Sequence, residues 1–202
     1  NAIRVIVHKD KIETLASMPY IAFLEPIPAP GVKEDNEGRG LHRVNLIDTG
    51  LPSGMNYDGS GINVNCRDDG AVGPHIDFKN RMNQDFVGDY RGTHGDGVSG
   101  MMAGGGNIDP RNKGMAKDAY VYVTDYQADF LDVTMELFFD HNVIITNSSY
   151  SNGCNAGYTV ITETVETQLW ENQTLMHTFS AGNSNNLNCG YGAGNQWGNV
   201  TG

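Results

Sequence analysis

The segment 93–104 reads Thr-His-Gly-Asp-Gly-Val-Ser-Gly-Met-Met-Ala-Gly and decides how the rest of the chain is interpreted. A single histidine, His94, opens a run of small residues that then turns apolar. This pattern predicts an imidazole in the first turn of a buried helix, where glycines let other backbone segments approach. We expect Val98, Met101 and Met102 to face the core. A histidine beside glycine is also compatible with a purely structural role, so the neighbouring segments must decide.

The composition of the 202 residues is typical of one main domain with an appendage. Thirteen basic and 24 acidic residues give a net charge of -11, which argues against nucleic acid or an anionic membrane surface as partner. No apolar run is long enough to span a membrane, and the first residues lack the layout of a signal peptide. The charge is compatible with a protein that works outside cells.

The three cysteines, Cys66, Cys154 and Cys189, are too few for a disulfide scaffold and lack the spacing of a zinc site. One disulfide and one buried free thiol fit this number better. These residues alone leave the pairing open.

Residues 2–25 have the pattern of a strand, a helix and a second strand. Alternating residues 3–7 predict the first strand, Asp10 is expected to cap the helix, and the apolar residues 21–24 predict the second strand. This is half of a small α+β unit, too small to fold well alone. It is either part of something larger or the first two strands of the main sheet.

The segment 26–40 contains three prolines and three glycines among charged residues. Such a composition is typical of a linker and of a processing site. It places a domain boundary near Ala29.

From residue 61 onward, strands and helices alternate with short connections. The predicted strands lie at 62–67, 119–123, 143–146 and 175–179, and the predicted helices at about 130–141 and 159–171. This alternation predicts an α/β fold, a mostly parallel sheet with helices on both faces. In such sheets the carboxyl ends of the strands carry the functional groups, so a site is expected there.

Polar residues follow three of these strands. Asp-Asp-Gly at 68–70 follows the first strand, although Asp-Gly is also a common turn. The segment 147–153 is small and polar, and as an exposed edge it would offer backbone groups to an extended peptide. In the segment 180–184, the amide of Asn183 beside a glycine would donate a hydrogen bond to a developing oxyanion. A polar loop is the alternative interpretation of both segments.

Taken together, these motifs resemble the subtilisin-like serine proteases, the subtilase family. Their order is Asp-Asp-Gly at 68–70, His-Gly-x-x-Val-x-Gly at 94–100, Asn-Ser-Ser at 147–149 and Ala-Gly-Asn at 181–183. Each motif is weak alone, whereas their combination in the family's order is specific. The resemblance runs from about residue 61 to the end of the chain and implies a subtilisin-like fold.

The resemblance gives Asp68 the role of the triad aspartate, which orients the catalytic histidine and stabilises its imidazolium. A second motif, Ile-Asp-Thr-Gly at 47–50, matches the family's short aspartate motif more literally. No suitable strand follows it, and it lacks a counterpart of Pro-His-Ile-Asp-Phe at 74–78, which is similar to the family's His-Pro-Asp-Leu segment. Asp68 is therefore preferred.

The resemblance gives His94 the role of the general base. The family motif, His-Gly-Thr-His-Val-Ala-Gly, contains two histidines, and placing His94 on the second would put Arg91 at the catalytic position and imply an inactive enzyme. We place His94 on the first, so the departures are Asp96 for Thr and Gly97 for the second His. The added carboxylate near His94 leaves the basicity of the imidazole open.

By the same resemblance, Asn183 is the oxyanion donor. The predicted substrate-binding residues are Ser149, Tyr150, Ser151, Ala181 and Gly182. The family brings the segments of Cys154 and Cys189 together near the specificity pocket, which implies a disulfide between them and leaves Cys66 free.

The resemblance also divides the chain. Residues 1–29 resemble the C-terminal part of a propeptide that inhibits the enzyme, with an α+β fold. Residues 30–60 are then a linker and the N-terminal segment of the catalytic domain, and residues 61–202 its N-terminal part. No cofactor is required for the implied chemistry, and calcium commonly stabilises the family as a structural ion.

The family's nucleophile motif, Gly-Thr-Ser-x-(Ala or Ser)-x-Pro, does not occur in these residues. We therefore expect a fragment, incomplete at its C-terminus, of a secreted or cell-surface serine endopeptidase. Such a fragment is inactive alone and needs the rest of its catalytic domain, in the same or a separate chain, to hydrolyse peptides or proteins.

Two alternatives stay open. The first is a non-catalytic subtilase relative that binds peptide or serves as a subunit of a larger assembly. The second is a metal hydrolase with His75 and Asp77 as a ligand pair among nearby carboxylates and histidines. The metal site leaves the motifs at 147–149 and 181–183 unexplained.

Overall fold

The computed structural model describes residues 5–21, 35–88, 91–126, 130–150, 158 and 160–182. The chain divides into two compact units, residues 1–33 and 34–202, and each is described by itself. None of the helices in the described part is long and apolar enough to cross a membrane.

The first unit contains a 3-10 helix, η1 (Lys9–Lys11), followed directly by helix α1 (Ile12–Ala16). The expected helix is therefore present, but the prediction for its cap is wrong. Asp10 lies inside η1, whose N-cap residue is His8. A carboxylate in the first turn still favours the helix through its dipole, which explains why Asp10 suits this place without capping it.

Neither strand expected in this unit is seen in its described part. Residues 5–7 form no strand, and Ile6 is fully exposed. Of the second expected strand only Ile21 is described, and it lies outside any strand. An alternating segment is stable as a strand only when another strand satisfies its backbone groups. The resemblance of residues 1–29 to a propeptide stays a prediction.

The second unit is built on a parallel sheet. Its described strands are β1 (Asn63–Asp68), β2 (Met82–Phe86), β3 (Tyr120–Asp125), β4 (Val143–Ser148) and β5 (Met176–Phe179). They lie in the order β2-β3-β1-β4-β5, and each neighbouring pair is parallel. Parallel neighbours need long crossover connections, which contain the helices.

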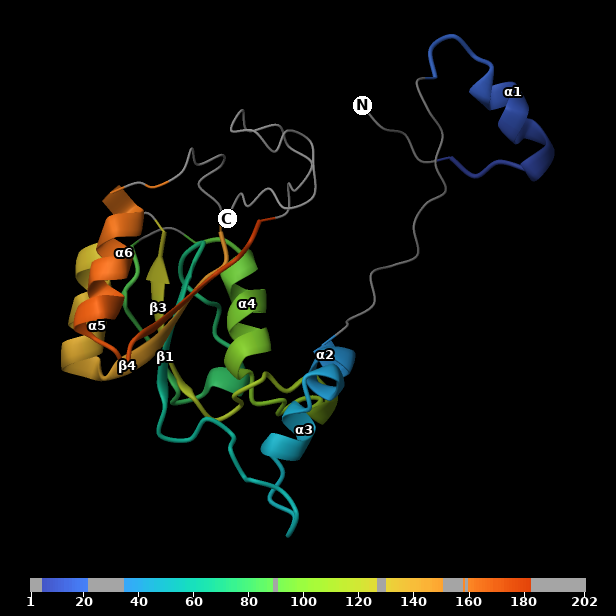
Figure 1. Ribbon diagram of the computed structural model, residues 1–202. Coiled ribbons are helices and arrows are strands. Elements are labelled where there is room, and N and C mark those ends of the chain that lie inside the picture. The colour runs from blue at the N-terminus through green and yellow to red at the C-terminus, as the bar shows by residue number, and fades with distance from the viewer. Residues whose placement is uncertain are drawn as a thin grey trace. The chain divides into compact units, whose positions relative to one another are not determined.

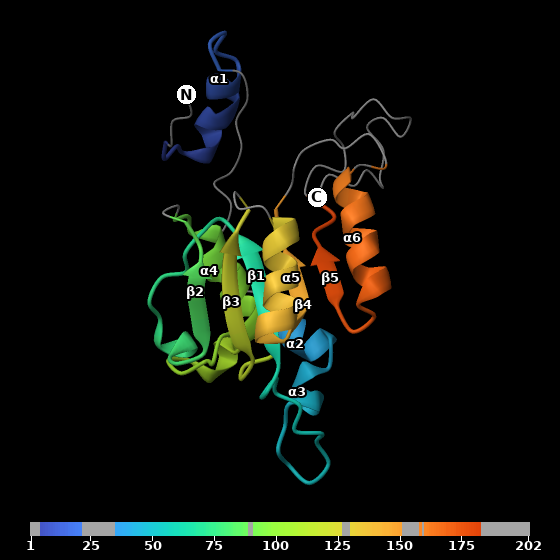
Figure 2. The same ribbon diagram turned by 90° about the vertical axis from the view of Figure 1, so that its left-hand side faces the viewer.

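Helices cover both faces of this sheet. Helix α4 (His94–Ala103) lies on one face, whereas α5 (Phe130–His141) and α6 (Val160–Glu171) lie on the other (Figures 1 and 2). Two 3-10 helices, η2 (Ile76–Phe78) and η3 (Pro110–Asn112), lie in the connections before β2 and β3. This architecture confirms the predicted α/β fold.

The core lies between α4 and the sheet. Side chains alternate along β1, so Val64, Cys66 and Asp68 share one face. Val64 and Cys66 are buried there in a cluster with Val98 of α4. The same alternation therefore directs the carboxylate at the end of β1 toward α4.

Helix α4 begins at His94, so the histidine lies in the first turn as predicted. Val98 and Ala103 are buried, and Met102 packs partly against the same core. The expectation for Met101 is wrong, because this side chain is 52% exposed. A helix presents one stripe to a sheet, and Met101 lies outside that stripe.

Two helices, α2 (Asp35–Leu41) and α3 (Val44–Ile47), extend into the segment predicted as a linker. They are held by a buried ion pair. The guanidinium of Arg39 pairs with the carboxylate of Asp48 and also donates to the backbone oxygen of Gly114. The division between the two units, at residues 33 and 34, lies within the segment 26–40.

A polar layer lies between the sheet and α6. His177 Nδ1 lies 2.6 Å from Thr146 Oγ1, and His177 Nε2 lies 3.2 Å from Gln168 Oε1 on α6. Burial, and then the positive charge of Arg67, lower the pKa of His177 from its ordinary value of 6.5 to about 4. The imidazole is therefore neutral at pH 7.

Candidate active site

The topology of the sheet creates a site at the carboxyl ends of β1 and β4. These two strands are neighbours, but the chain leaves β1 toward β2 on one side and leaves β4 toward β5 on the other. At such a switch point the two connections diverge and leave a crevice between them. Asp68 is the last residue of β1, and Ser148 is the last residue of β4.

Asp68 and His94 lie in contact at this edge. Asp68 Oδ1 is 2.7 Å from His94 Nδ1, although the residues are 26 positions apart in the chain. The aspartate side chain is 1% exposed and the histidine side chain 62% exposed. An ionised carboxylate can only accept, so this contact puts the imidazole proton on Nδ1 and leaves Nε2 free to take a proton.

The carboxylate of Asp68 is also contacted by the backbone of the next residue. Its Oδ1 accepts a second hydrogen bond, 2.9 Å long, from the backbone N–H of Asp69. Its Oδ2 is buried and has no hydrogen-bond partner within the described part of the chain. The carboxylate next to the imidazole is thus shielded from solvent.

Asp69 binds the N-terminus of α4. Its Oδ2 accepts from the backbone N–H groups of Thr93 and His94, at 3.0 and 2.9 Å, and its Oδ1 accepts from Gly95 at 2.7 Å. Partial burial raises the pKa of Asp69, but these three donors lower it more, so it lies below its ordinary value of 3.8. The carboxylate thus satisfies donors that a helix leaves unpaired at its first turn.

Asp96, the departure from the family motif, does not compete for His94. Its Oδ1 accepts a 2.7 Å hydrogen bond from the backbone N–H of Gly73, on the segment that follows β1. This carboxylate therefore makes a structural contact with a neighbouring loop instead of a contact with the imidazole.

The predicted substrate segments lie side by side at the same edge of the sheet. The N–H of Ser180 donates to the backbone oxygen of Ser148 at 3.0 Å, and its hydroxyl donates to the backbone oxygen of Tyr150 at 3.2 Å. Ser149 and Tyr150 are partly exposed next to this pairing. Ala181 is exposed and Gly182 has a φ of 83°, so the chain turns sharply there.

Four predicted site residues lie outside the described residues: Ser151, Cys154, Asn183 and Cys189. The oxyanion role and the disulfide therefore stay predictions. Cys66 is buried and free, and burial raises the pKa of its thiol to about 12, so it is a packed core residue rather than a nucleophile.

Asp48, of the competing aspartate motif, is the partner of Arg39. This contact gives it a structural role and leaves Asp68 as the aspartate beside the histidine. The metal interpretation also finds no support in the described residues, among which no group of three His, Cys, Asp or Glu side chains could hold a metal ion. His75 Nδ1 instead accepts from the N–H of Asp77.

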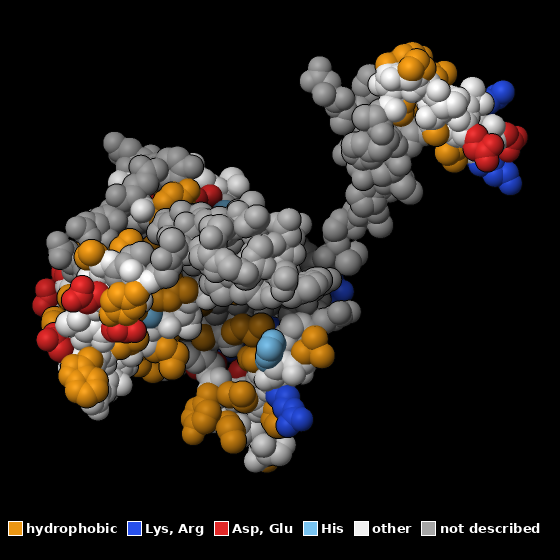
Figure 3. All heavy atoms as spheres, turned by 45° about the horizontal axis from the view of Figure 1, so that its top comes forward, with side chains coloured by type: hydrophobic (Ala, Val, Ile, Leu, Met, Phe, Trp, Pro, Cys, Tyr) orange, Lys and Arg blue, Asp and Glu red, His pale blue; other side chains and the backbone are white. Residues whose placement is uncertain are grey.

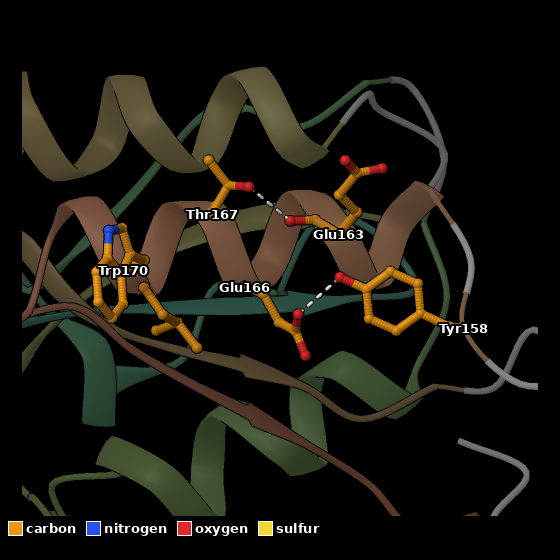
Figure 4. Close-up of a pocket in the computed structure, with 6 residues that line it drawn as sticks. Tyr158, Glu163, Glu166, Thr167 and Trp170 are labelled. Atoms are coloured by element: carbon orange, nitrogen blue, oxygen red, sulfur yellow. Dashed lines mark hydrogen bonds between the residues drawn. The ribbon is translucent and has the colours of Figure 1, made fainter.

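Cavities lie on both faces of the second unit. One of about 590 Å³ lies along α6, where the hydroxyl of Tyr158 donates to Glu166 beside Trp170 (Figure 4). None of the described residues that line it is a histidine, serine or cysteine. A second, of about 350 Å³, lies between the segment after β1 and α4, and Asp96 and Gly73 line it. The second cavity is the one beside the helix that carries His94.

The sequence matches the profile of a known protein family. Residues 59–201, more than half of the chain, match the sequence profile of the subtilase family. No curated protein sequence matches the chain significantly.

Three solved structures are similar to the chain. The CspB protease of Clostridium perfringens superimposes with a TM-score of 0.56 at 19% identity, over 72% of this chain and 40% of that one. A serine protease of Aeromonas sobria gives a TM-score of 0.48 at 21% identity, over 64% of this chain and 26% of that one.

The third is a cold-adapted subtilisin-like serine proteinase, which gives a TM-score of 0.46 at 21% identity, over 64% of this chain and 50% of that one. The chain therefore spans half or less of the length of each of these structures. The first superposition agrees with the parallel sheet and its helices, and the family profile covers the strands, helices and motifs that form the site. This chain belongs to the subtilase family.

Proposed function

We propose that this chain provides the aspartate and histidine of a Ser-His-Asp site in a serine endopeptidase, whose serine comes from a part of the protein outside these residues. The contact between Asp68 and His94 carries the proposal. A buried carboxylate behind an exposed imidazole is the arrangement that a general base needs, because the carboxylate fixes the tautomer and the free nitrogen faces the reactants.

The reaction would proceed by acyl transfer. The serine hydroxyl attacks the carbonyl carbon of the scissile peptide bond while His94 Nε2 takes its proton. Asp68 stabilises the imidazolium that forms, and Asn183, with a backbone N–H, holds the oxyanion. His94 then gives the proton to the leaving amine, and water releases the acyl group by the same steps in reverse.

An extended peptide substrate is the ligand that fits the edge of the sheet. The partly exposed backbone at 149–150, continued by residue 151, would pair with the substrate in the manner of an added strand. Ala181 and Gly182 would lie beside the scissile carbonyl. We further propose secretion or attachment to the cell surface, a disulfide between Cys154 and Cys189, and calcium as a structural ion.

The net charge of -11 argues against nucleic acid as a partner. Acidic side chains gather over α5 and α6 on the left of Figure 3. Exposed acidic residues of these helices are Glu136, Asp140, Glu163, Glu166 and Glu171. Such a face repels phosphate groups and keeps the protein soluble.

Peptide hydrolysis by the full-length protein tests the proposal. His94→Ala should abolish turnover, and His42→Ala, which removes another exposed imidazole, should leave it unchanged. Circular dichroism verifies that both variants fold. An unchanged rate in His94→Ala would refute the catalytic assignment, and a folded full-length protein without any peptidase activity would favour the relative that only binds peptide.

A further inference from the structure

Two carboxylates connect the segment after β1 to the start of α4. One carboxylate lies on the segment and accepts from the helix, and the other lies on the helix and accepts from the segment. Asp69 lies on the segment after β1 and accepts from N–H groups of α4 and its N-cap residue. Asp96 lies on α4 and accepts from the N–H of Gly73, on the segment after β1. We propose that this pair, which we call the clasp, positions His94 against Asp68. The inference rests on the proposed function and names two positioning residues for it.

The first half of the clasp connects the neighbours of both catalytic groups. Asp69 follows Asp68 directly, and one of its three donors is the backbone N–H of His94 itself. The N–H of Asp69 also binds Asp68 Oδ1. A single residue, Asp69, thus contacts both the carboxylate of Asp68 and the backbone of His94. A backbone contact reinforces this connection, since the N–H of Gly92 donates to the backbone oxygen of Asp69 at 2.8 Å.

The sequence around His94 leaves room for this contact. A Cβ atom on Gly92 would lie 1.9 Å from Asp69 Oδ2, a distance that atoms cannot adopt. A Cβ atom on Gly95 would lie 3.0 Å from Asp69 Oδ1 and 3.2 Å from the Cβ of Asp68. Gly92 therefore leaves the space that the Asp69 carboxylate occupies, and a side chain at Gly95 would press against the same carboxylate.

The second half of the clasp holds the other end of the same segment. Gly73 donates to Asp96, and its neighbour Val72 is bound by Gln84 of β2. The amide of Gln84 accepts from the N–H of Val72 at 2.7 Å and donates to its oxygen at 3.0 Å. The segment 69–73 is thus bound to α4 and to β2, and it cannot shift unless contacts on both sides break.

The two halves differ in strength. Asp69 is partly buried and uses both carboxylate oxygens, whereas Asp96 is exposed and uses one. Hydrogen bonds to a charged acceptor are stronger where water competes less. Asp69 is therefore the main positioning residue, and Asp96 a supporting one.

Nitrogen NMR of histidine in the full-length protein tests the clasp without relying on activity, with the nucleophilic serine replaced to prevent self-digestion. In the unmodified site, neutral His94 should carry its proton on Nδ1. Asp69→Ala should give a mixture of both tautomers, because the imidazole no longer faces Asp68. Asp85→Ala, an equal change of charge at an exposed site on β2, is the control.

The conservative variants separate hydrogen bonding from charge. Asp96→Asn keeps the one oxygen that Gly73 needs, so it should behave like the unmodified protein. Asp69→Asn keeps one of the two acceptor oxygens, so its fraction of the Nδ1 tautomer of His94 should lie between those of Asp69→Ala and the unmodified protein. This variant also serves as the test if Asp69→Ala fails to fold. If asparagine is as harmful as alanine at residue 96, the clasp does not work through its hydrogen bonds and the inference fails.

Turnover gives the second readout. Asp69→Ala should lower kcat about 100-fold and Asp96→Ala about tenfold, with KM changed less than about threefold, because orientation of the base is lost while the substrate edge is intact. A folded Asp69→Ala variant with the Nδ1 tautomer and full kcat would overturn the inference. If the tautomer changes but His94→Ala still turns over, the clasp stands and the proposed function fails.

Discussion

Asp68 Oδ1 lies 2.7 Å from His94 Nδ1, with the carboxylate buried beneath an imidazole that faces solvent. The two groups come from a strand end and a helix start that the sheet topology brings to one edge. Because Asp68 is not solvated, the pair is sensitive to any change of its charge. The first prediction follows from this asymmetry.

Asp68→Asn should lower kcat by about 10³ to 10⁴ while the protein stays folded. The amide of asparagine can donate, so it favours the tautomer with the proton on Nε2, which cannot act as a base. The rate of peptide hydrolysis by the full-length protein measures this effect. Asp85→Asn, on the edge strand, is the matched control and should keep the full rate; a comparable loss in both variants would show that Asp68 has no special role.

The buried ion pair between Arg39 and Asp48 should be important for stability rather than activity. Arg39→Met leaves a carboxylate buried without its partner, which typically costs about 3 to 5 kcal/mol. Urea unfolding should therefore show a lower midpoint for this variant. Adding Asp48→Leu should restore much of the loss, because neither charge is then left unpaired.

His177 should make the fold sensitive to mild acid. Its pKa is about 4 in the folded protein and 6.5 ordinarily, so between these values the unfolded chain binds a proton that the folded chain excludes. Stability must then fall as the pH drops from about 6.5 to 4, and it is fully present above 6.5. Thermal midpoints at pH 7.5 and 5 should differ less in His177→Gln than in the unmodified protein. His42→Gln should keep the full difference.

Two glycines of the same segment should respond in opposite ways to alanine. Gly92→Ala places a Cβ atom against the Asp69 carboxylate and should destabilise the protein and displace His94. Gly97→Ala meets no atom within 4 Å and lies exposed in α4, so it should stabilise the helix by about 1 kcal/mol. Denaturant unfolding of both variants provides the comparison. Equal destabilisation would contradict the close contact at Gly92.

Strong periodicity made much of the fold predictable. Helix α5 has the predicted bounds, and the strands β1, β3, β4 and β5 lie within two residues of their predicted bounds. Their apolar residues repeat with the period of the element. The strand β2 was missed because Met-Asn-Gln-Asp-Phe lacks apolar alternation, and an edge strand needs little of it. Helices α2 and α3 were not predicted; Arg39 of α2 pairs with Asp48, nine residues further on and directly after α3.

The site was predictable only in part. The motifs indicated Asp68 and His94, because a strand end and a helix start carry recognisable residues. The partners of Asp69 and Asp96 were not predictable, since each lies more than 20 residues away and depends on how the segment after β1 folds back on α4. In the sequence, the only trace of such contacts is the glycines around His94, whose lack of a side chain leaves space for the Asp69 carboxylate.

The most direct test of the proposed reaction is covalent labelling of the full-length protein with a fluorophosphonate, which reacts with a serine activated by a histidine base. We predict one modified serine, found by mass spectrometry in a Gly-Thr-Ser motif, and loss of labelling in His94→Ala but not in His42→Ala. Equal labelling of the unmodified protein and His94→Ala, or none in a folded and active protein, would contradict catalysis through the Asp68 and His94 pair.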